Sequence, residues 1–352
     1  MNDKKKTRRR KATEKTSDDD GTQMEGAEKK TKNKKKDKVV SRRRTVEEGT
    51  VEHGGDKFQE QLKEFVKHCL QVGVNGIIQE FAQIKVETAQ PGPKTAYDAN
   101  ADKNRYKDVV CIDVSRVKLV ADQDYIHANY MDFNGFERKY ICTQGPTEKT
   151  VGDFWKMVVQ AKAPAIVMLC GIMELGKKKC EQYWPEQQGS SGVFGDFTIK
   201  NTAVHIPEEG LALTTLEVSI NEKEHLVVTH YFWQSWPDRG VPKNPMFCMR
   251  LIGKLNRYNT VVVHCSAGIG RTGTIVGLDY ANRILHKGEQ LRLKEVVKEM
   301  RRHRHNSVQT DVQYLFMHRV LMGIAENRHL VQASEIQPFM TAYDDFVKSK
   351  GG

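Results

Sequence analysis

The segment VVVHCSAGIGRTG, residues 261–273, constrains the fold of this chain more than any other. Its start is an apolar, β-branched run typical of a buried strand, and the residues after it open an amphipathic stretch typical of a helix. Between them, Gly268 and Gly270 permit the positive φ or the close backbone approach that a tight turn requires. The sequence therefore predicts a strand, a tight loop and a helix in direct succession, with Cys265 where the strand ends.

Such a loop is expected to bind an anion, because its backbone N–H groups point inward and the helix N-terminus adds positive partial charge. The helix dipole, the loop amides and Arg271 should together lower the pKa of the Cys265 thiol, and the thiolate is the nucleophilic form. The guanidinium of Arg271 can bind two phosphoryl oxygens at once, which a lysine cannot match. This pattern predicts transfer of a phosphoryl group to sulfur.

Taken alone, a cysteine and an arginine six residues apart are more often an ordinary buried thiol and a surface charge. The complete string HCSAGIGRTG, residues 264–273, favours the catalytic interpretation because it resembles, residue for residue, the phosphate loop of the tyrosine-specific protein phosphatases. This resemblance implies that Cys265 is the nucleophile and that Thr272 hydrogen-bonds the sulfur as it leaves. It also implies that the loop binds phosphate through Ser266, Ala267, Gly268, Ile269, Gly270 and Arg271, with support from His264.

Further segments resemble the same family in the expected order and cover the chain from about Gly76 to about Leu321. They are KNRYKDV (103–109), DYIHANY (124–130), TQGP (143–146), DFW (153–155), ELGKKKCEQYWP (174–185), WPDRGVP (236–242) and VQTDVQY (308–314). The joint order of these segments, rather than any one of them, supports the family interpretation.

A phosphatase of this kind needs a proton for the departing phenolate, and Asp238 on a loop suits a general acid. The neighbouring Trp236 suits a lid that closes over bound phosphate. Gln309 and Gln313 are four residues apart, which predicts that they share one helix face. By resemblance, these glutamines hold the water that cleaves the cysteinyl-phosphate, while the ionised Asp238 acts as base.

The remaining site residues follow from the resemblance alone. Tyr106 would stack on the substrate ring at the rim of a deep pocket, and Asp108 would fix the backbone of the substrate peptide. Glu174 would hold Arg271 in place, and Lys179 belongs to the same supporting segment. No cofactor and no metal are expected, since His303 and His305 lack cysteine or carboxylate partners at ligand spacing.

The sequence departs from the family pattern at five positions. His127, Cys142 and His303 are interpreted as structural replacements. Arg239, directly after the predicted general acid, and Ser307 could alter lid closure or rate. Arg239 is also the one feature that favours an alternative function, a phosphotyrosine-binding module with weak turnover.

Short β-rich runs from Tyr106 onward, followed and interrupted by helical runs, predict an α/β fold with a mixed sheet flanked by helices. The resemblance implies that this sheet is highly twisted. Helical spacing begins near Asp56, and a second helical run is expected at 76–85. The expected organisation is a disordered Lys/Arg-rich tail (1–55), one phosphatase domain (56–330) and a C-terminal extension (331–352).

Residues 1–45 carry 18 Lys and Arg against 8 Asp and Glu, so most of the net charge of +11 lies in the tail. Such a tail could contact nucleic acid or an anionic membrane, or direct nuclear import, and a solubilising role is an equal alternative. Seven scattered cysteines and no secretory signal predict a reduced intracellular protein, cytoplasmic or also nuclear. No apolar run reaches about 18 residues, so no transmembrane segment is expected. The expected partners are proteins that carry phosphotyrosine.

Overall fold

The computed structural model describes residues 55–221, 223–237 and 240–351. In these ranges the main sheet has nine strands in the order β1-β2-β3-β11-β4-β10-β9-β8-β7. Its centre is parallel, since β11 pairs with β3 and β4, and β4 pairs with β10, whereas the outer pairs are antiparallel. The strands are β1 Arg116–Lys118, β2 Tyr125–Met131, β3 Lys139–Thr143, β4 Ala165–Met168, β7 Ser191–Phe194, β8 Phe197–Glu208, β9 Leu211–Ile220, β10 Lys223–Trp233 and β11 Thr260–His264.

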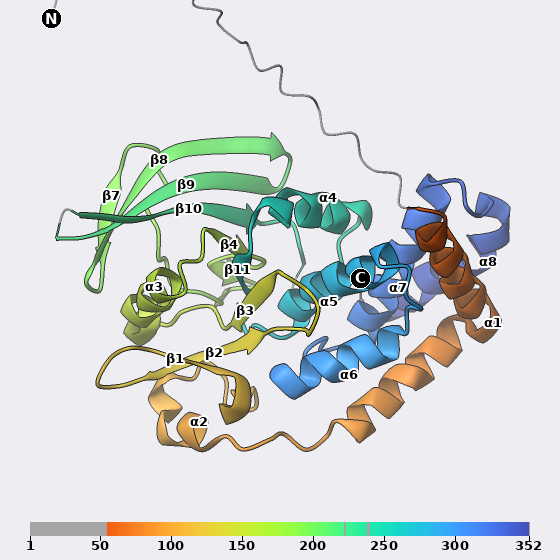
Figure 1. Ribbon diagram of the computed structural model, residues 1–352, viewed down its shortest axis with the longest axis horizontal. Helices are drawn as coiled ribbons and strands as arrows, with labels where there is room; N and C mark the ends of the chain where they lie inside the picture. Colours follow the sequence, from red (N-terminus) through yellow and green to blue (C-terminus); the bar gives the residue numbers. More distant parts are fainter. Residues whose placement is uncertain (1–54, 222, 238–239, 352) are drawn as a thin grey trace, which may run out of the picture. The chain divides into compact units, whose positions relative to one another are not determined.

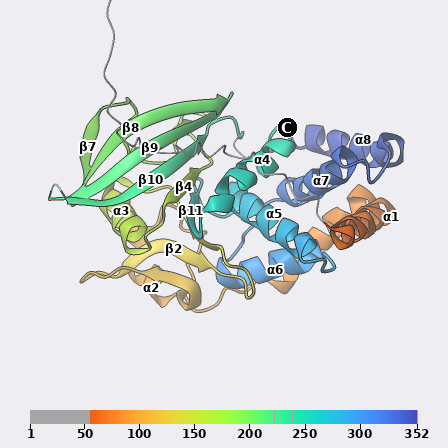
Figure 2. The same ribbon diagram turned by 45° about the horizontal axis from the view of Figure 1, so that its top comes forward.

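Helices cover both sides of this sheet, so the predicted mixed, twisted sheet with flanking helices is confirmed. Figures 1 and 2 show α1 and α4 to α8 gathered on one side and α3 on the other. The helices are α1 Asp56–Glu87, α2 Thr95–Ala99, α3 Val151–Gln160, α4 Met246–Lys254, α5 Gly270–His286, α6 Leu293–His303, α7 Asp311–Asn327 and α8 Ala333–Ser349. A separate small hairpin pairs β5 Met173–Glu174 with β6 Lys177–Lys178.

The central position of β11 follows from its composition. Val261, Val262 and Val263 are fully buried, as expected for a parallel strand that is covered on both faces. The strand ends at His264, whose Cα is paired with those of Thr143 on β3 and Met168 on β4. The loop after β11 therefore emerges at the carboxyl edge of three neighbouring strands, where open α/β sheets place their ligand sites.

The two helical runs predicted near the start of the described chain form one long element, α1, which is interrupted at Gly73 (φ 66°, ψ 178°). Its apolar side chains at helical spacing, among them Phe58 and Leu62, are buried as the pattern predicts. At the other end, the segment predicted as a C-terminal extension forms α8, and its Phe339 and Tyr343 are buried in the main core.

In the ranges that the structure describes, no helix is both long enough and apolar enough to cross a membrane. The predicted basic tail lies outside the described residues.

Candidate active site

The loop between β11 and α5 holds Cys265, whose residue is only 4% exposed. The backbone N–H of Gly268 donates to its Sγ at 3.2 Å. Burial by itself raises the pKa of this thiol, but the charge of Arg271 and hydrogen bonds from Thr272 and Gly268 outweigh it and hold the pKa below its ordinary value. The site therefore favours the thiolate, which is the nucleophilic form of a cysteine.

The Thr272 side chain is fully buried, and its hydroxyl makes no hydrogen bond of ordinary geometry to nitrogen or oxygen within the described chain. It nevertheless lies close enough to Cys265 to lower the pKa of the thiol. The hydroxyl therefore lies beside the sulfur, and its role toward the sulfur as a leaving group stays a prediction.

The shape of the loop depends on Gly268, which has a φ of 71°. A Cβ at this position would lie 2.0 Å from the carbonyl oxygen of Thr143, so a larger residue is excluded by both backbone conformation and space. A Cβ at Gly270 would lie 2.9 Å from Nε2 of Gln313. The missing side chain at Gly268 lets the loop pack against the end of β3. The missing side chain at Gly270 leaves space for the side chains of Gln309 and Gln313.

Arg271 is fixed by two groups from distant parts of the chain. Its Nη1 and Nη2 donate to the two carboxylate oxygens of Glu174, and Nη1 also reaches the carbonyl oxygen of Trp236 at 3.3 Å. Glu174 begins the turn of the small β5–β6 hairpin, which brings its carboxylate beneath the phosphate loop. The structure thus joins the predicted supporting residues Glu174 and Trp236 to Arg271.

Arg304, which the sequence analysis did not single out, supports the outer side of the loop. It is fully buried, and its guanidinium donates to the carbonyl oxygens of Gly268 (2.6 Å) and Ala267 (3.0 Å). The arginine-rich run at 301–304 was the one sequence feature that pointed to this residue, but sequence alone does not tell which of these arginines is buried.

The segment around Tyr106 lies against the phosphate loop. The Tyr106 hydroxyl is 2.7 Å from Oγ of Ser266, and that Oγ donates to the carbonyl oxygen of Lys179. Arg105, a second residue missed from sequence, ties the segment down through Gly145 and Pro146, whose carbonyl oxygens accept from its guanidinium. The rim predicted at Tyr106 is therefore anchored to both neighbouring segments.

The glutamines lie at the start of α7, but the prediction of a shared helix face is wrong. Gln309 precedes the helix, whose N-cap is Thr310. The Oε1 of Gln313 accepts hydrogen bonds from the backbone N–H groups of Gln309 (3.0 Å) and Thr310 (3.3 Å). The side chain of Gln313 folds back to cap its own helix, and this capping is what brings the two glutamines together.

These elements enclose a pocket of about 430 Å³. Among the predicted site residues, Glu174, Trp236, His264, Gly268, Ile269 and Thr272 support the pocket without lining it. Asp238 and Arg239 lie outside the described residues. The lining consists of Tyr106, Asp108, Val109, Lys179, Cys265, Ser266, Ala267, Gly270, Arg271, Gln309, Thr310 and Gln313.

A buried chain of hydrogen bonds leads to the carbonyl of Cys265. His264 Nδ1 lies 3.2 Å from that oxygen, and its Nε2 lies 2.7 Å from the Tyr183 hydroxyl, which in turn is 2.7 Å from Nε2 of His230. Since a carbonyl only accepts, Nδ1 of His264 carries the proton and Tyr183 donates to Nε2. Burial lowers the pKa of His264 to about 4, so the ring is neutral and its orientation is fixed.

The departures from the family pattern lie mainly in the interior. His127 on β2 and Cys142 on β3 are buried, and so is Ser307, whose hydroxyl donates to the carbonyl oxygen of Arg304 at 2.8 Å. His303 ends α6, with Nε2 3.4 Å from the carboxylate of Glu299.

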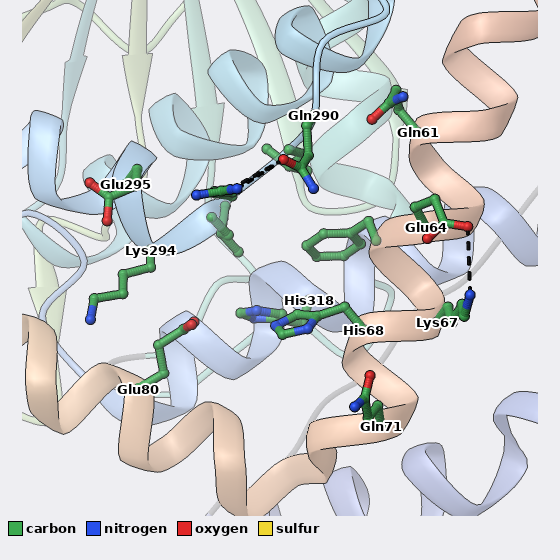
Figure 3. A pocket seen from close by; sticks show the side chains of 14 residues that line it. Gln61, Glu64, Lys67, His68, Gln71, Glu80, Gln290, Lys294, Glu295 and His318 are labelled. Carbon is green, nitrogen blue, oxygen red and sulfur yellow. Dashed lines mark hydrogen bonds and ion pairs between the residues drawn. The ribbon is translucent and has the colours of Figure 1, made fainter.

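A second hollow of about 590 Å³ lies between α1 and the start of α6 (Figure 3). His68, His318 and Glu80 are among the residues that line it, and the Glu80 carboxylate accepts a hydrogen bond from the Tyr314 hydroxyl. It contains none of the predicted site residues. In the described part of the chain, no three His, Cys, Asp or Glu side chains are placed to hold a metal ion.

Comparisons with known proteins identify the family of this chain. Residues 100–323 match the family model described as protein-tyrosine phosphatase. The human tyrosine-protein phosphatase non-receptor type 9 is 34% identical over 308 aligned positions, and the match covers 78% of this chain and 50% of that protein. The human receptor-type tyrosine-protein phosphatase C is 36% identical over 256 aligned positions, and the match covers 68% of this chain and 19% of that protein. This chain thus spans half or less of the length of these relatives.

Among solved structures, the catalytic domain of human protein tyrosine phosphatase non-receptor type 18 superposes with a TM-score of 0.69. Its sequence is 31% identical, and the match covers 75% of this chain and 99% of that domain. The family model, the relatives and this structure agree with the resemblance of the phosphate loop, and the chain belongs to the protein tyrosine phosphatase family.

Proposed function

We propose that this protein hydrolyses phosphotyrosine in proteins through a cysteinyl-phosphate intermediate on Cys265. The observation that carries the proposal is a thiol of lowered pKa in a pocket that it shares with Arg271. Since Arg271 is already bound bidentately by Glu174, its guanidinium is oriented before any substrate arrives. Preorganised charge of this kind stabilises a transferring phosphoryl group.

In the first step, the thiolate attacks phosphorus, a sulfur–phosphorus bond forms, and the bond to the tyrosine oxygen breaks. The departing phenolate takes a proton from Asp238, the proposed general acid. The loop N–H groups and Arg271 neutralise charge on the nonbridging oxygens throughout.

In the second step, water attacks the cysteinyl-phosphate and releases inorganic phosphate and the thiolate. Gln309 and Gln313, which line the pocket together, orient this water, and the ionised Asp238 takes its proton. The buried hydroxyl of Thr272 stabilises the sulfur as it leaves. Each group then returns to its initial protonation state.

The preference for tyrosine is proposed to depend on the depth of the pocket. Tyr106 and Cys265 both line the pocket, and Cys265 is the more buried of the two. With Tyr106 at the rim and Cys265 at the floor, a phosphoserine side chain would be too short to span the distance between them. The exposed carboxylate of Asp108 lines the rim, where it can accept hydrogen bonds from the backbone of a substrate peptide.

The test is turnover of matched phosphotyrosine and phosphoserine peptides. Cys265→Ser should abolish phosphate release, while Cys248→Ser, at a buried cysteine on α4, serves as the matched control. Equal turnover of the two peptides would remove the claim of tyrosine specificity. Binding without phosphate release by the wild-type protein would instead support the phosphotyrosine-binding module.

Physiological substrates are best sought with Asp238→Ala, which should disable proton donation while the thiolate and pocket remain. Phosphotyrosine proteins retained by this variant and displaced by vanadate, a phosphate analogue, are the expected substrates. An intracellular location, nuclear entry, and contact of the basic tail with nucleic acid or anionic membrane stay predictions. Deletion of residues 1–45, followed by measurement of location and of salt-dependent nucleic-acid binding, tests them.

A further inference from the structure

His127 lies within β2 and is only 1% exposed. It does not line the catalytic pocket, yet its ring lies between two segments that do. The edge of the Tyr97 ring packs against it, with ring centroids 5.9 Å apart. The imidazole is therefore surrounded by protein, and its hydrogen bonds determine its state.

Two contacts determine which ring nitrogen carries the proton. Nε2 lies 2.8 Å from the carbonyl oxygen of Val109, and Nδ1 lies 3.2 Å from Nη2 of Arg304. A carbonyl oxygen only accepts and a guanidinium only donates. Nε2 is therefore protonated and Nδ1 is bare, so a neutral His127 satisfies both partners. Burial and the charge of Arg304 agree with this tautomer, since they lower the pKa of His127 to about 3.

Through Arg304, His127 reaches the phosphate loop. Nε of this guanidinium donates to the carbonyl oxygen of Gly268, and Nη2, the nitrogen next to His127, also donates to that of Ala267. Nη1 donates to Oδ1 of Asn129 at 2.7 Å. Two carbonyls of the loop thus point toward Arg304 and away from the pocket. Because the N–H and C=O of a peptide unit point in opposite directions, this arrangement turns loop N–H groups toward the phosphate position.

Through Val109, the same imidazole reaches the segment that carries Tyr106 and Asp108. Arg105 anchors this segment on one side, since its backbone N–H donates to Oε1 of Gln144 at 2.9 Å. The hydrogen bond from His127 to Val109 anchors it on the other side. The rim residues lie between these two anchors.

We infer that His127 is a positioning residue that fixes the segment carrying Tyr106 and Asp108 relative to the phosphate loop. The path from Val109 through His127 and Arg304 to Gly268 sets the separation between the Tyr106 rim and the Cys265 floor. This inference rests on the proposed function, because that separation matters for a substrate that spans both.

Two substitutions of His127 remove its two hydrogen bonds, to Val109 and to Arg304, one at a time. In His127→Gln, the amide nitrogen can reach the position of Nε2 and donate to Val109, but no acceptor remains for Arg304. In His127→Asn, the shorter amide can accept from Arg304 but cannot reach Val109. His205→Asn, on an exposed stretch of β8, is the matched control.

The variants are compared on a phosphotyrosine peptide and on p-nitrophenyl phosphate, which carries an aryl phosphate but no peptide backbone. His127→Asn should raise KM for the peptide about three- to tenfold, the effect of one lost hydrogen bond, with a smaller change in kcat. His127→Gln should lower kcat for both substrates by about the same factor, since it disturbs the phosphate loop. The control should retain both parameters.

Equal kinetics of the two variants, or losses that only follow the fraction of folded protein in thermal unfolding, would overturn the inference. A measurement on the wild-type protein tests the inference without any substitution that could unfold the chain. Nitrogen-15 NMR should show His127 as the Nε2–H tautomer between about pH 5.5 and 8, well above the lowered pKa. An imidazolium or an Nδ1–H tautomer would contradict the inference. If the wild-type protein turned over neither substrate, the proposed function would fail instead.

Discussion

The carboxylate of Glu174 faces the guanidinium of Arg271 in a bidentate ion pair, with Nη2 2.8 Å from Oε2 and Nη1 2.5 Å from Oε1. The two side chains are 11% and 5% exposed. The pair joins the β5–β6 hairpin to the phosphate loop across 97 residues of sequence. It therefore links the stability of the domain to the orientation of the Arg271 guanidinium.

Replacement of Glu174 by alanine should remove the carboxylate that neutralises a buried guanidinium. We expect a loss of about 3 kcal/mol in the free energy of unfolding and a fall in kcat/KM of about a hundredfold from misplacement of Arg271. Urea unfolding and steady-state kinetics measure the two effects. Glu181→Gln, which breaks the exposed pair with Lys178 near the same hairpin, should cost less than about 1 kcal/mol. Similar losses in the two variants would contradict the role of the buried pair.

The lowered pKa of Cys265 predicts selective alkylation. Its reaction with iodoacetate should reach half of its maximal rate below about pH 8.5, the ordinary value for a cysteine. By contrast, burial raises the pKa of Cys111 to about 11 and that of Cys142 to about 12, so these thiols should not react in the folded protein. Peptide mapping identifies the modified residue.

Thr272→Ala should move the midpoint of this alkylation profile to higher pH, because it removes a hydroxyl that lowers the pKa of the thiol. An unchanged midpoint would show that Arg271 and the loop amides alone set the pKa.

Removal of the Gln309 side chain and removal of the Gln313 side chain should have different effects on the free energy of unfolding. Gln313→Ala deletes the acceptor for two backbone N–H groups at the start of α7, so it should lower stability by about 1 kcal/mol. The capping acceptor is Gln313, whereas the Gln309 side chain is exposed. Gln309→Ala should therefore change the free energy of unfolding by less than about 0.5 kcal/mol. Both variants should slow hydrolysis of the cysteinyl-phosphate. Rapid-quench measurement of the phosphoenzyme, together with urea unfolding, checks both effects, and a Gln309→Ala variant without phosphoenzyme accumulation would contradict the proposed role.

Buried histidines should make the domain sensitive to acid. Burial lowers the pKa of His127 and His230 to about 3 and that of His264 and His318 to about 4. The unfolded chain titrates near pH 6.5, so below that pH it binds more protons than the folded protein, and stability falls as the pH falls. At pH 5 each of these histidines should lower the free energy of unfolding by roughly 2 kcal/mol relative to neutral pH.

Urea unfolding at pH 7.5 and pH 5.0 measures this loss. His318→Asn should make the loss smaller, because it removes one buried group that must be protonated on unfolding. His205→Asn, at an exposed position, should leave the loss as it is. A domain equally stable at both pH values would refute the prediction.

Local pattern was sufficient for the strand, loop and helix at 261–273, because each of these elements is specified by neighbouring residues. The same is true of the interrupted helical run in α1. Asp238, whose role came from resemblance, lies outside the described residues, and that role stays a prediction. The shared helix face of Gln309 and Gln313 was predicted wrongly, since a spacing of four does not reveal that the helix begins between them at Asp311.

Other parts of the site depend on contacts that no local pattern encodes. The importance of Arg304 comes from its burial against a loop 36 residues away, and the neighbouring arginine Arg302 is exposed to solvent. The hydrogen-bonded chain from His230 through Tyr183 to His264 joins residues from three separate segments.

The sequence by itself determined the family, and it predicts Cys265 as the nucleophile and Arg271 as its partner, because thirteen consecutive residues specify the backbone of the loop and the side chains that it carries. Only the tertiary structure decided what holds that loop in place. Glu174, Arg304 and His127 act there by satisfying buried charges and hydrogen bonds. Such partners are selected by proximity in the folded chain, and proximity between residues far apart in sequence exists only once the sheet has assembled.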